Sequence, residues 1–287
     1  MKFSPIIYLI GMLLCILSIF MLIPAIVDWF YEGKDWPAFV GSSMATLFIG
    51  SILFLTNRGS ATEHLELRQA FLLTNSAWIS IALFGSLPFL LSDIDMSFID
   101  AFFESTSGIT TTGATVIENL ESKSRGILIW RALLQWLGGV GIIVMALAVL
   151  PMLSIGGMQL FKTESYETPD KVVPKAASFA AGISIVYITL TIIWAFMLWG
   201  AGMPIFDSIA HAMTTLATGG YSTKSESLAA FNSSTIELII IFGMLVGSLP
   251  FVHYLTLTKN GIRNLIKDDQ VKLFLTLVLF VVLIMSL

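Results

Sequence analysis

Residues 100–115 read Asp-Ala-Phe-Phe-Glu-Ser-Thr-Ser-Gly-Ile-Thr-Thr-Thr-Gly-Ala-Thr, and residues 207–222 read Asp-Ser-Ile-Ala-His-Ala-Met-Thr-Thr-Leu-Ala-Thr-Gly-Gly-Tyr-Ser. The two stretches align without a gap at a separation of 107 positions, so that Thr111 falls on Thr218 and Gly113 on Gly220. Each copy is a short apolar segment that runs into a loop of Thr and Gly. The chain therefore contains an internal repeat, and this repeat decides the expected fold.

The apolar segments at 98–109 and 204–216 are too short to cross a membrane. At ~1.5 Å per residue, a helix over either segment is roughly 18 Å long, about half of a bilayer. Each segment lies between two full-length hydrophobic runs. Irregular backbone is tolerated at membrane depth only where it is buried in protein or lines water. The pattern predicts two re-entrant pore loops, as in a cation channel or a channel-like transporter.

The composition is that of a membrane protein. Of the 287 residues, 56% are hydrophobic and 12% are charged, whereas a soluble protein has about a quarter charged. The lipid bilayer is therefore an expected partner, whereas the net charge of −4 indicates no nucleic-acid partner. Cys15 is the single cysteine, so no intrachain disulfide is possible. We expect an all-α polytopic membrane protein.

Long runs with few charges predict seven membrane spans, which lie at 5–27, 38–56, 70–91, 127–155, 176–200, 235–258 and 271–287. The repeating unit is a span, a half-length helix, a Thr-Gly loop and a second span. We expect two N-terminal transmembrane helices within 1–69, a first pore repeat at 70–155 and a second at 176–258. Residues 271–287 resemble the opening span of a third repeat.

The distribution of Lys and Arg predicts the orientation. With the N-terminus in the cytoplasm, ten basic residues fall in inside segments and four in outside loops. The positive-inside rule favours this arrangement. Both half-length helices then enter from the outside in the same sense, so the repeat is parallel. Inverted repeats are typical of many secondary transporters instead.

The loops offer the chemistry of a filter for monovalent cations. Peptide carbonyls in a narrow pore replace the hydration shell of the ion. A carbonyl aimed along the pore often needs a positive φ, which Gly adopts without penalty. Thr hydroxyls add further oxygens or brace the loop. The half-length helices point their partly negative C-terminal ends at the pore centre. The candidate potassium ligands are Thr111, Thr112, Gly113, Thr218, Gly219 and Gly220.

Several charged residues accompany the loops. Asp100 and Asp207 fit the first turn of their half-length helices, where a carboxylate caps the positive end. Glu104 and His211 match one turn deeper, which indicates either a functional ionisable group or a hydrogen bond behind the filter. Arg131 lies near the outer end of a span, where it is expected to reach the interface or to pair with a loop carboxylate.

Small residues follow both loops. We interpret them mainly as contacts that let helices approach closely, with bending or gating as the alternative. These residues are Gly138, Gly139, Gly141, Gly243 and Gly247.

Three motifs resemble the TrkH branch of the bacterial TrkH/TrkG/KtrB potassium-transport superfamily. They are Thr-Thr-Thr-Gly-Ala-Thr at 110–115, Arg-Ala-Leu-Leu-Gln-Trp-Leu-Gly-Gly-Val-Gly at 131–141 and Ala-Thr-Gly-Gly-Tyr-Ser-Thr at 217–223. The resemblance implies four pore repeats around one potassium pathway, each with a filter glycine, here Gly113 and Gly220. It also implies a homodimer in the inner membrane and a cytoplasmic nucleotide-binding regulatory ring, TrkA.

The chain departs from that pattern because it ends within what resembles the third repeat, and we interpret it as a truncated form of the family. Potassium is expected as the transported ion, with no organic cofactor. Three alternatives stay open: a sodium- or proton-coupled symporter, a non-conducting membrane subunit and an intramembrane enzyme. A serine at the first filter glycine accompanies sodium coupling in related proteins, so Gly113 favours the potassium channel. Motifs of metalloproteases and serine hydrolases are absent from the sequence, so we expect no enzyme.

Overall fold

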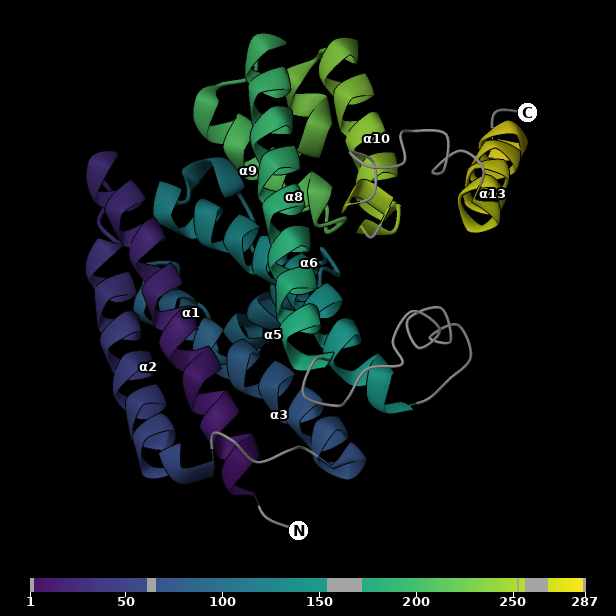
Figure 1. The fold of residues 1–287 in the computed structure, drawn as a ribbon. Coiled ribbons are helices and arrows are strands. Elements are labelled where there is room, and N and C mark those ends of the chain that lie inside the picture. Colours follow the sequence, from purple (N-terminus) through teal and green to yellow (C-terminus); the bar gives the residue numbers. More distant parts are fainter. Residues whose placement is uncertain (1–2, 61–65, 154–171, 252, 256–267, 286–287) are drawn as a thin grey trace.

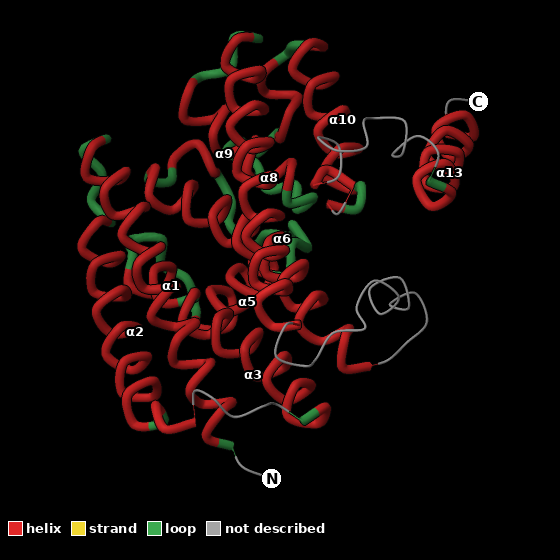
Figure 2. The backbone as a smooth tube through the Cα atoms, in the orientation of Figure 1, coloured by secondary structure: helices red, strands yellow, loops and turns green. Residues whose placement is uncertain are grey.

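The computed structural model describes residues 3–60, 66–153, 172–251, 253–255 and 268–285. Within these ranges the chain consists of helices joined by loops and turns, with no strand (Figure 1, Figure 2). The expected all-α class is confirmed. The segments between predicted spans at 156–175 and 259–270, which the proposed orientation puts inside the cell, lie largely outside the described residues.

The N-terminal helices form an antiparallel hairpin along one side of the molecule (Figure 1). Helix α1 spans Ser4–Phe30 and helix α2 spans Trp36–Thr56. Glycine allows their close approach, because a Cβ at Gly11 would lie 2.8 Å from the Gly50 carbonyl oxygen. Asp28, fully buried at the end of α1, accepts hydrogen bonds from the Asp35 and Gly126 backbone N–H groups. The hairpin is thereby fixed to the start of helix α6.

The first repeat contains α3 (Leu67–Gly85), the short α4 (Leu87–Leu91), α5 (Phe98–Ile109) and α6 (Arg125–Leu153). Helix α5 corresponds to the predicted half-length segment at 98–109, with the same bounds. It packs between α3 and α6, and α1 covers α3 and α6 from outside. The half-length helix is therefore held inside the bundle.

The second repeat has a similar order of elements, with no counterpart of α4 among the described residues. Helix α8 spans Val172–Gly200, α9 spans Ile205–Leu216 and α10 spans Ser234–Ser248. Helix α9 packs against α6 of the first repeat as well as against α8 and α10. Helix α13 (Asp269–Met285) follows and lies apart from the two repeats in Figure 1.

The span predicted over 235–258 is not one continuous helix, which corrects the sequence analysis. Helix α10 ends at Ser248, and Leu249 is extended with φ −77° and ψ 149°. The cause is Pro250, whose ring disfavours the helical conformation of the preceding residue. Tyr254 donates a hydrogen bond of 2.6 Å to the Val246 carbonyl oxygen, which stabilises the break.

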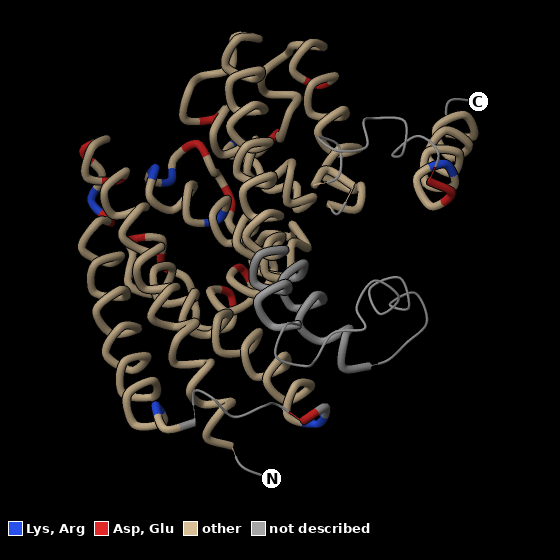
Figure 3. Tube along the Cα trace, viewed as in Figure 1, with Lys and Arg blue, Asp and Glu red and all other residues tan. Residues whose placement is uncertain are grey.

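Four helical segments among the described residues are long and apolar enough to cross a membrane: Ser4–Phe30, Trp36–Thr56, Arg68–Leu91 and Ala180–Gly200. Many large apolar side chains on these helices are exposed, including Ile19, Phe48, Ile79 and Phe196. Lys, Arg, Asp and Glu are scarce along the long helices (Figure 3). An apolar outer face of this kind is suited to lipid contact, in agreement with a polytopic membrane protein.

Candidate ion filter

The two half-length helices begin with well-defined caps. The Ser97 hydroxyl accepts a hydrogen bond of 3.2 Å from the Asp100 N–H group and donates one of 2.6 Å to the Asp100 carboxylate. Helix α9 begins directly after Pro204, and Asp207 lies in its first turn. Both helices have twelve residues and run inward to end at the Thr-Gly loops. The first-turn positions predicted for Asp100 and Asp207 are confirmed.

The two loops have matching φ angles at equivalent residues. Thr111 and Thr218 each have a φ of 55°, and the candidate filter glycines Gly113 and Gly220 have φ values of 80° and 78°. The positive φ predicted for the glycines is therefore confirmed. Equivalent hydrogen bonds of 2.9 Å join Thr112 N to Ser107 O and Gly219 N to Thr214 O. The left-handed conformation of the two threonines has no signal in the sequence, because L-residues rarely adopt it.

Carbonyl groups are available along both loops. No described residue donates a hydrogen bond to the carbonyl oxygens of the six candidate ligands, which are Thr111, Thr112, Gly113, Thr218, Gly219 and Gly220. Backbone carbonyls in folded proteins are otherwise almost always paired. These groups are therefore free to coordinate a cation or water.

The ionisable residues Glu104 and His211 make hydrogen bonds with the part of each loop that follows the candidate filter glycine. The Thr115 hydroxyl and the Val116 N–H group donate to the Glu104 carboxylate over distances of 3.0 Å and 3.1 Å. At the equivalent place in the second repeat, His211 Nε2 lies 3.1 Å from the Ser222 hydroxyl oxygen. Of the two roles weighed from the sequence, a hydrogen bond behind the filter agrees with both geometries.

Arg131 has a different position from the one expected. Its side chain is 1% exposed, and its Nε donates to Glu104 Oε1 over 2.7 Å. Its Nη1 donates to the Ser222 carbonyl oxygen over 2.9 Å, and its guanidinium carbon lies 4.1 Å from the Tyr221 ring centre. The expected position at the interface is therefore wrong, whereas the expected pairing with a carboxylate is present, with Glu104 of α5 as the partner instead of a loop residue. Arg131 joins the half-length helix of one repeat to the loop of the other.

Two further residues tie the loops together. The Tyr221 hydroxyl donates to the Glu104 carbonyl oxygen over 3.0 Å, which crosses from the second loop to the first pore helix. Gln135, on α6, accepts a hydrogen bond of 3.0 Å from the Tyr221 N–H group. Sequence analysis did not select either residue for a role, since both contacts depend on how the two repeats pack.

The glycines after the loops allow close packing, as expected. A Cβ at Gly138 would overlap the Ile109 carbonyl oxygen, and a Cβ at Gly247 would lie 2.9 Å from the Leu216 carbonyl oxygen. Ile109 and Leu216 are the last residues of the two half-length helices α5 and α9. Each long helix therefore contacts the end of the half-length helix that precedes it.

The segments that follow the two Thr-Gly loops are also joined by hydrogen bonds. Ser225 donates from its N–H group and from its hydroxyl to the Glu121 carboxylate, in both cases over 2.7 Å. These hydrogen bonds hold the pKa of Glu121 below its usual range. In the second repeat, the Thr223 hydroxyl donates to Asp207 over 2.7 Å, with Arg125 3.8 Å from the same oxygen.

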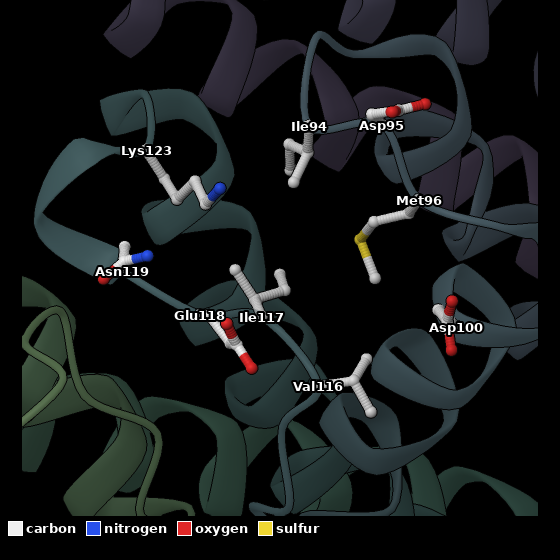
Figure 4. Close-up of a pocket in the computed structure, with 9 residues that line it drawn as sticks. All are labelled: Ile94, Asp95, Met96, Asp100, Val116, Ile117, Glu118, Asn119 and Lys123. Atoms are coloured by element: carbon white, nitrogen blue, oxygen red, sulfur yellow. The ribbon is translucent and has the colours of Figure 1, made fainter.

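A cavity of about 300 Å³ lies beside the segment that follows the first loop (Figure 4). Asp95, Asp100, Glu118 and Lys123 are its charged lining residues, and Met96 extends into its centre in Figure 4. None of the six candidate ligands lines it. The cavity and the candidate filter are separate features of this side of the molecule.

The comparisons with known proteins agree with this arrangement. Residues 36–287 match the TrkH family model, described as a cation transport protein. The Trk system potassium uptake protein TrkH of Vibrio parahaemolyticus is 39% identical over 98% of this chain, and its Salmonella typhimurium counterpart is 38% identical over 100%. Escherichia coli TrkG, also a Trk system potassium uptake protein, is 35% identical over 97%.

A solved structure has the same fold. The crystal structure of the potassium transporter TrkH from Vibrio parahaemolyticus matches 98% of this chain with a TM-score of 0.87 and 37% identity. The chain spans 58% of that protein and about 60% of the TrkH relatives named above. With the family model matching most of the chain, the protein belongs to the TrkH family of cation transport proteins.

Proposed function

We propose that this chain contributes to potassium uptake across the bacterial inner membrane and that its two Thr-Gly loops form part of the selectivity filter. The observation that carries the proposal is the match in φ between equivalent residues of the two loops, with carbonyls at six positions that accept no hydrogen bond from a described residue. Two loops of similar conformation are suited to contribute oxygens to one ion path. The names of the matched relatives, Trk system potassium uptake proteins, support potassium as the ion.

The proposed roles follow from position. The carbonyl oxygens of Thr111, Thr112 and Gly113 face the ion from the first loop, and those of Thr218, Gly219 and Gly220 face it from the second. Carbonyl dipoles compensate the loss of hydration for a monovalent cation. The negative ends of α5 and α9 add a favourable potential at the same place.

The proposed orientation has the N-terminus in the cytoplasm and the pore helices entering from the periplasm. The distribution of Lys and Arg supports it. We further propose that the chain works as part of a homodimer with a cytoplasmic nucleotide-binding ring similar to TrkA, as the family resemblance implies. Co-purification with such a ring protein tests this association.

Flux measurements test the proposal and separate it from coupled symport. A transport-competent assembly containing this chain is placed in liposomes loaded with potassium, without a sodium or proton gradient. A conducting filter gives potassium efflux that exceeds sodium efflux under these conditions. A flux that requires an imposed sodium or proton gradient would identify a symporter, and the absence of any flux would contradict the proposal.

A further inference from the structure

One face of α6 contacts the second loop at several successive positions. Arg131, Gln135 and Gly139 are spaced four residues apart, so they lie on the same side of the helix. Arg131 donates to the Ser222 carbonyl, Gln135 accepts from the Tyr221 N–H group, and a Cβ at Gly139 would lie 3.2 Å from Ala217 Cα. A helix of the first repeat therefore lies behind the loop of the second.

The orientation of the Gln135 amide is fixed by its partner. A backbone N–H group can only donate, so the atom that faces Tyr221 N must be the Oε1 oxygen. The Nε2 group then has no partner, and it is one of two buried side-chain polar atoms without one in the described part of the chain. Gln135 is fully buried. Of the two polar atoms of the Gln135 amide, only the oxygen therefore makes a hydrogen bond with a described residue.

The hydrogen bond from the Tyr221 N–H group to Gln135 constrains the direction of the Gly220 carbonyl, which is one of the candidate ligands. The Tyr221 N–H group belongs to the same planar trans peptide as the Gly220 carbonyl, and the two groups point in opposite directions. Holding the N–H group against α6 turns the Gly220 carbonyl away from α6. The space beside Gly220 is open, with no atom within 4 Å of an ideal Cβ. Gly220 has little intrinsic resistance to rotation of this peptide.

The matching position of the second repeat does not carry an amide. Gly138 and Gly247 make equivalent contacts with the ends of α5 and α9, so Met244 on α10 matches Gln135. Met244 is exposed among the described residues, whereas Gln135 is fully buried against the second loop. An apolar residue at position 135 would avoid the unpaired Nε2 group but would lose the hydrogen bond to Tyr221 N.

We propose that Gln135 is a positioning residue of the filter, which aims the Gly220 carbonyl at the ion path and so sets the preference for potassium over sodium. This inference rests on the proposed function and adds a residue outside the loops to the selectivity mechanism. Filter carbonyls replace the hydration shell of the ion, so the number of carbonyls that point at the ion affects which ion is bound best.

The decisive variant is Gln135→Met, because methionine keeps the volume of the side chain but removes the hydrogen-bond acceptor. In liposomes that contain the transport-competent assembly, Gln135→Met is expected to lower the potassium-to-sodium flux ratio by about fivefold, the effect of losing one ordinary hydrogen bond. Leu133→Met, a buried change on another face of α6, serves as the matched control.

A second variant keeps the test informative if Gln135→Met fails to fold. Gly219 does not have a positive φ, so alanine is acceptable to its backbone, but the added Cβ would overlap the Gln135 amide. Gly219→Ala should therefore lower the flux ratio as Gln135→Met does. An unchanged ratio in Gly219→Ala and Gln135→Met, or an equal loss in the control Leu133→Met, would overturn the inference. Wild-type protein without potassium-selective flux would instead contradict the proposed function.

Discussion

At the residue scale, the Glu104–Arg131 pair dominates the interior behind the loops. Both side chains are almost completely buried, and their ionised groups lie 2.7 Å apart. Thr115, Val116 and the Ser222 carbonyl satisfy most of the remaining hydrogen-bonding capacity. Because the pair connects the first pore helix to the second loop, its loss would affect both repeats.

Removing either partner of this pair should be costly. Glu104→Gln or Arg131→Gln leaves one charge buried without its counterion, which costs about 3–5 kcal/mol. We expect a large fall in the unfolding midpoint of the detergent-solubilised protein in each case. The matched control is Asp269→Asn, which breaks an exposed ion pair with Lys272 and should leave the midpoint unchanged. Equal effects of the buried and exposed changes would contradict this role.

The contact between the outer loops gives a prediction for acid conditions. The pKa of Glu121 is lowered by its hydrogen bonds to Ser225, so this contact stabilises the folded state above the usual pKa of glutamate. The contribution is lost as the pH falls through the lowered pKa in the folded protein. We expect the protection factor of Ser225 N, the ratio of its intrinsic to its observed hydrogen-exchange rate, to fall on acidification in the wild type. Glu121→Gln should remove this pH dependence; a dependence that survives in the variant would place its origin elsewhere.

At the element scale, the approach of α6 to the end of α5 depends on Gly138. A Cβ there would overlap the Ile109 carbonyl oxygen, and backbone atoms cannot yield as a flexible side chain does. Gly138→Ala should therefore destabilise the protein by about 1–3 kcal/mol. Gly41→Ala is the matched control, because it lies in α2 with no atom within 4 Å of its Cβ. That change should stabilise the helix slightly, and unfolding midpoints of the two variants test the difference.

The sequence predicted the elements better than their contacts. The half-length helices and the positive φ of Gly113 and Gly220 follow from local patterns, and the structure has them. The repeat also placed Glu104 and His211 at matching positions. The contacts of Arg131 and Gln135 with the loop of the other repeat could not be predicted. Local sequence patterns do not indicate which helix packs behind which loop.

At the scale of the whole molecule, the orientation in the membrane is open to a direct test. With the N-terminus in the cytoplasm, Ser122 lies outside and Gly59 inside the cell, and both are exposed. In a Cys15→Ser background, Ser122→Cys should react with an impermeant thiol reagent in intact cells. Gly59→Cys should react only after the cells are lysed. The opposite pattern would reverse the proposed direction of the pore.

The central claim is that the two Thr-Gly loops select potassium, and replacing their glycines tests it most directly. Serine at Gly113 or Gly220 must adopt a positive φ, at a cost of about 1–2 kcal/mol, and at Gly113 its Cβ would also overlap the Gly219 carbonyl oxygen. In liposomes with the transport-competent assembly, we expect both variants to lower the potassium-to-sodium flux ratio, Gly113→Ser more strongly. Wild-type ratios in both variants, with folding intact, would contradict the account and remove these loops from the filter.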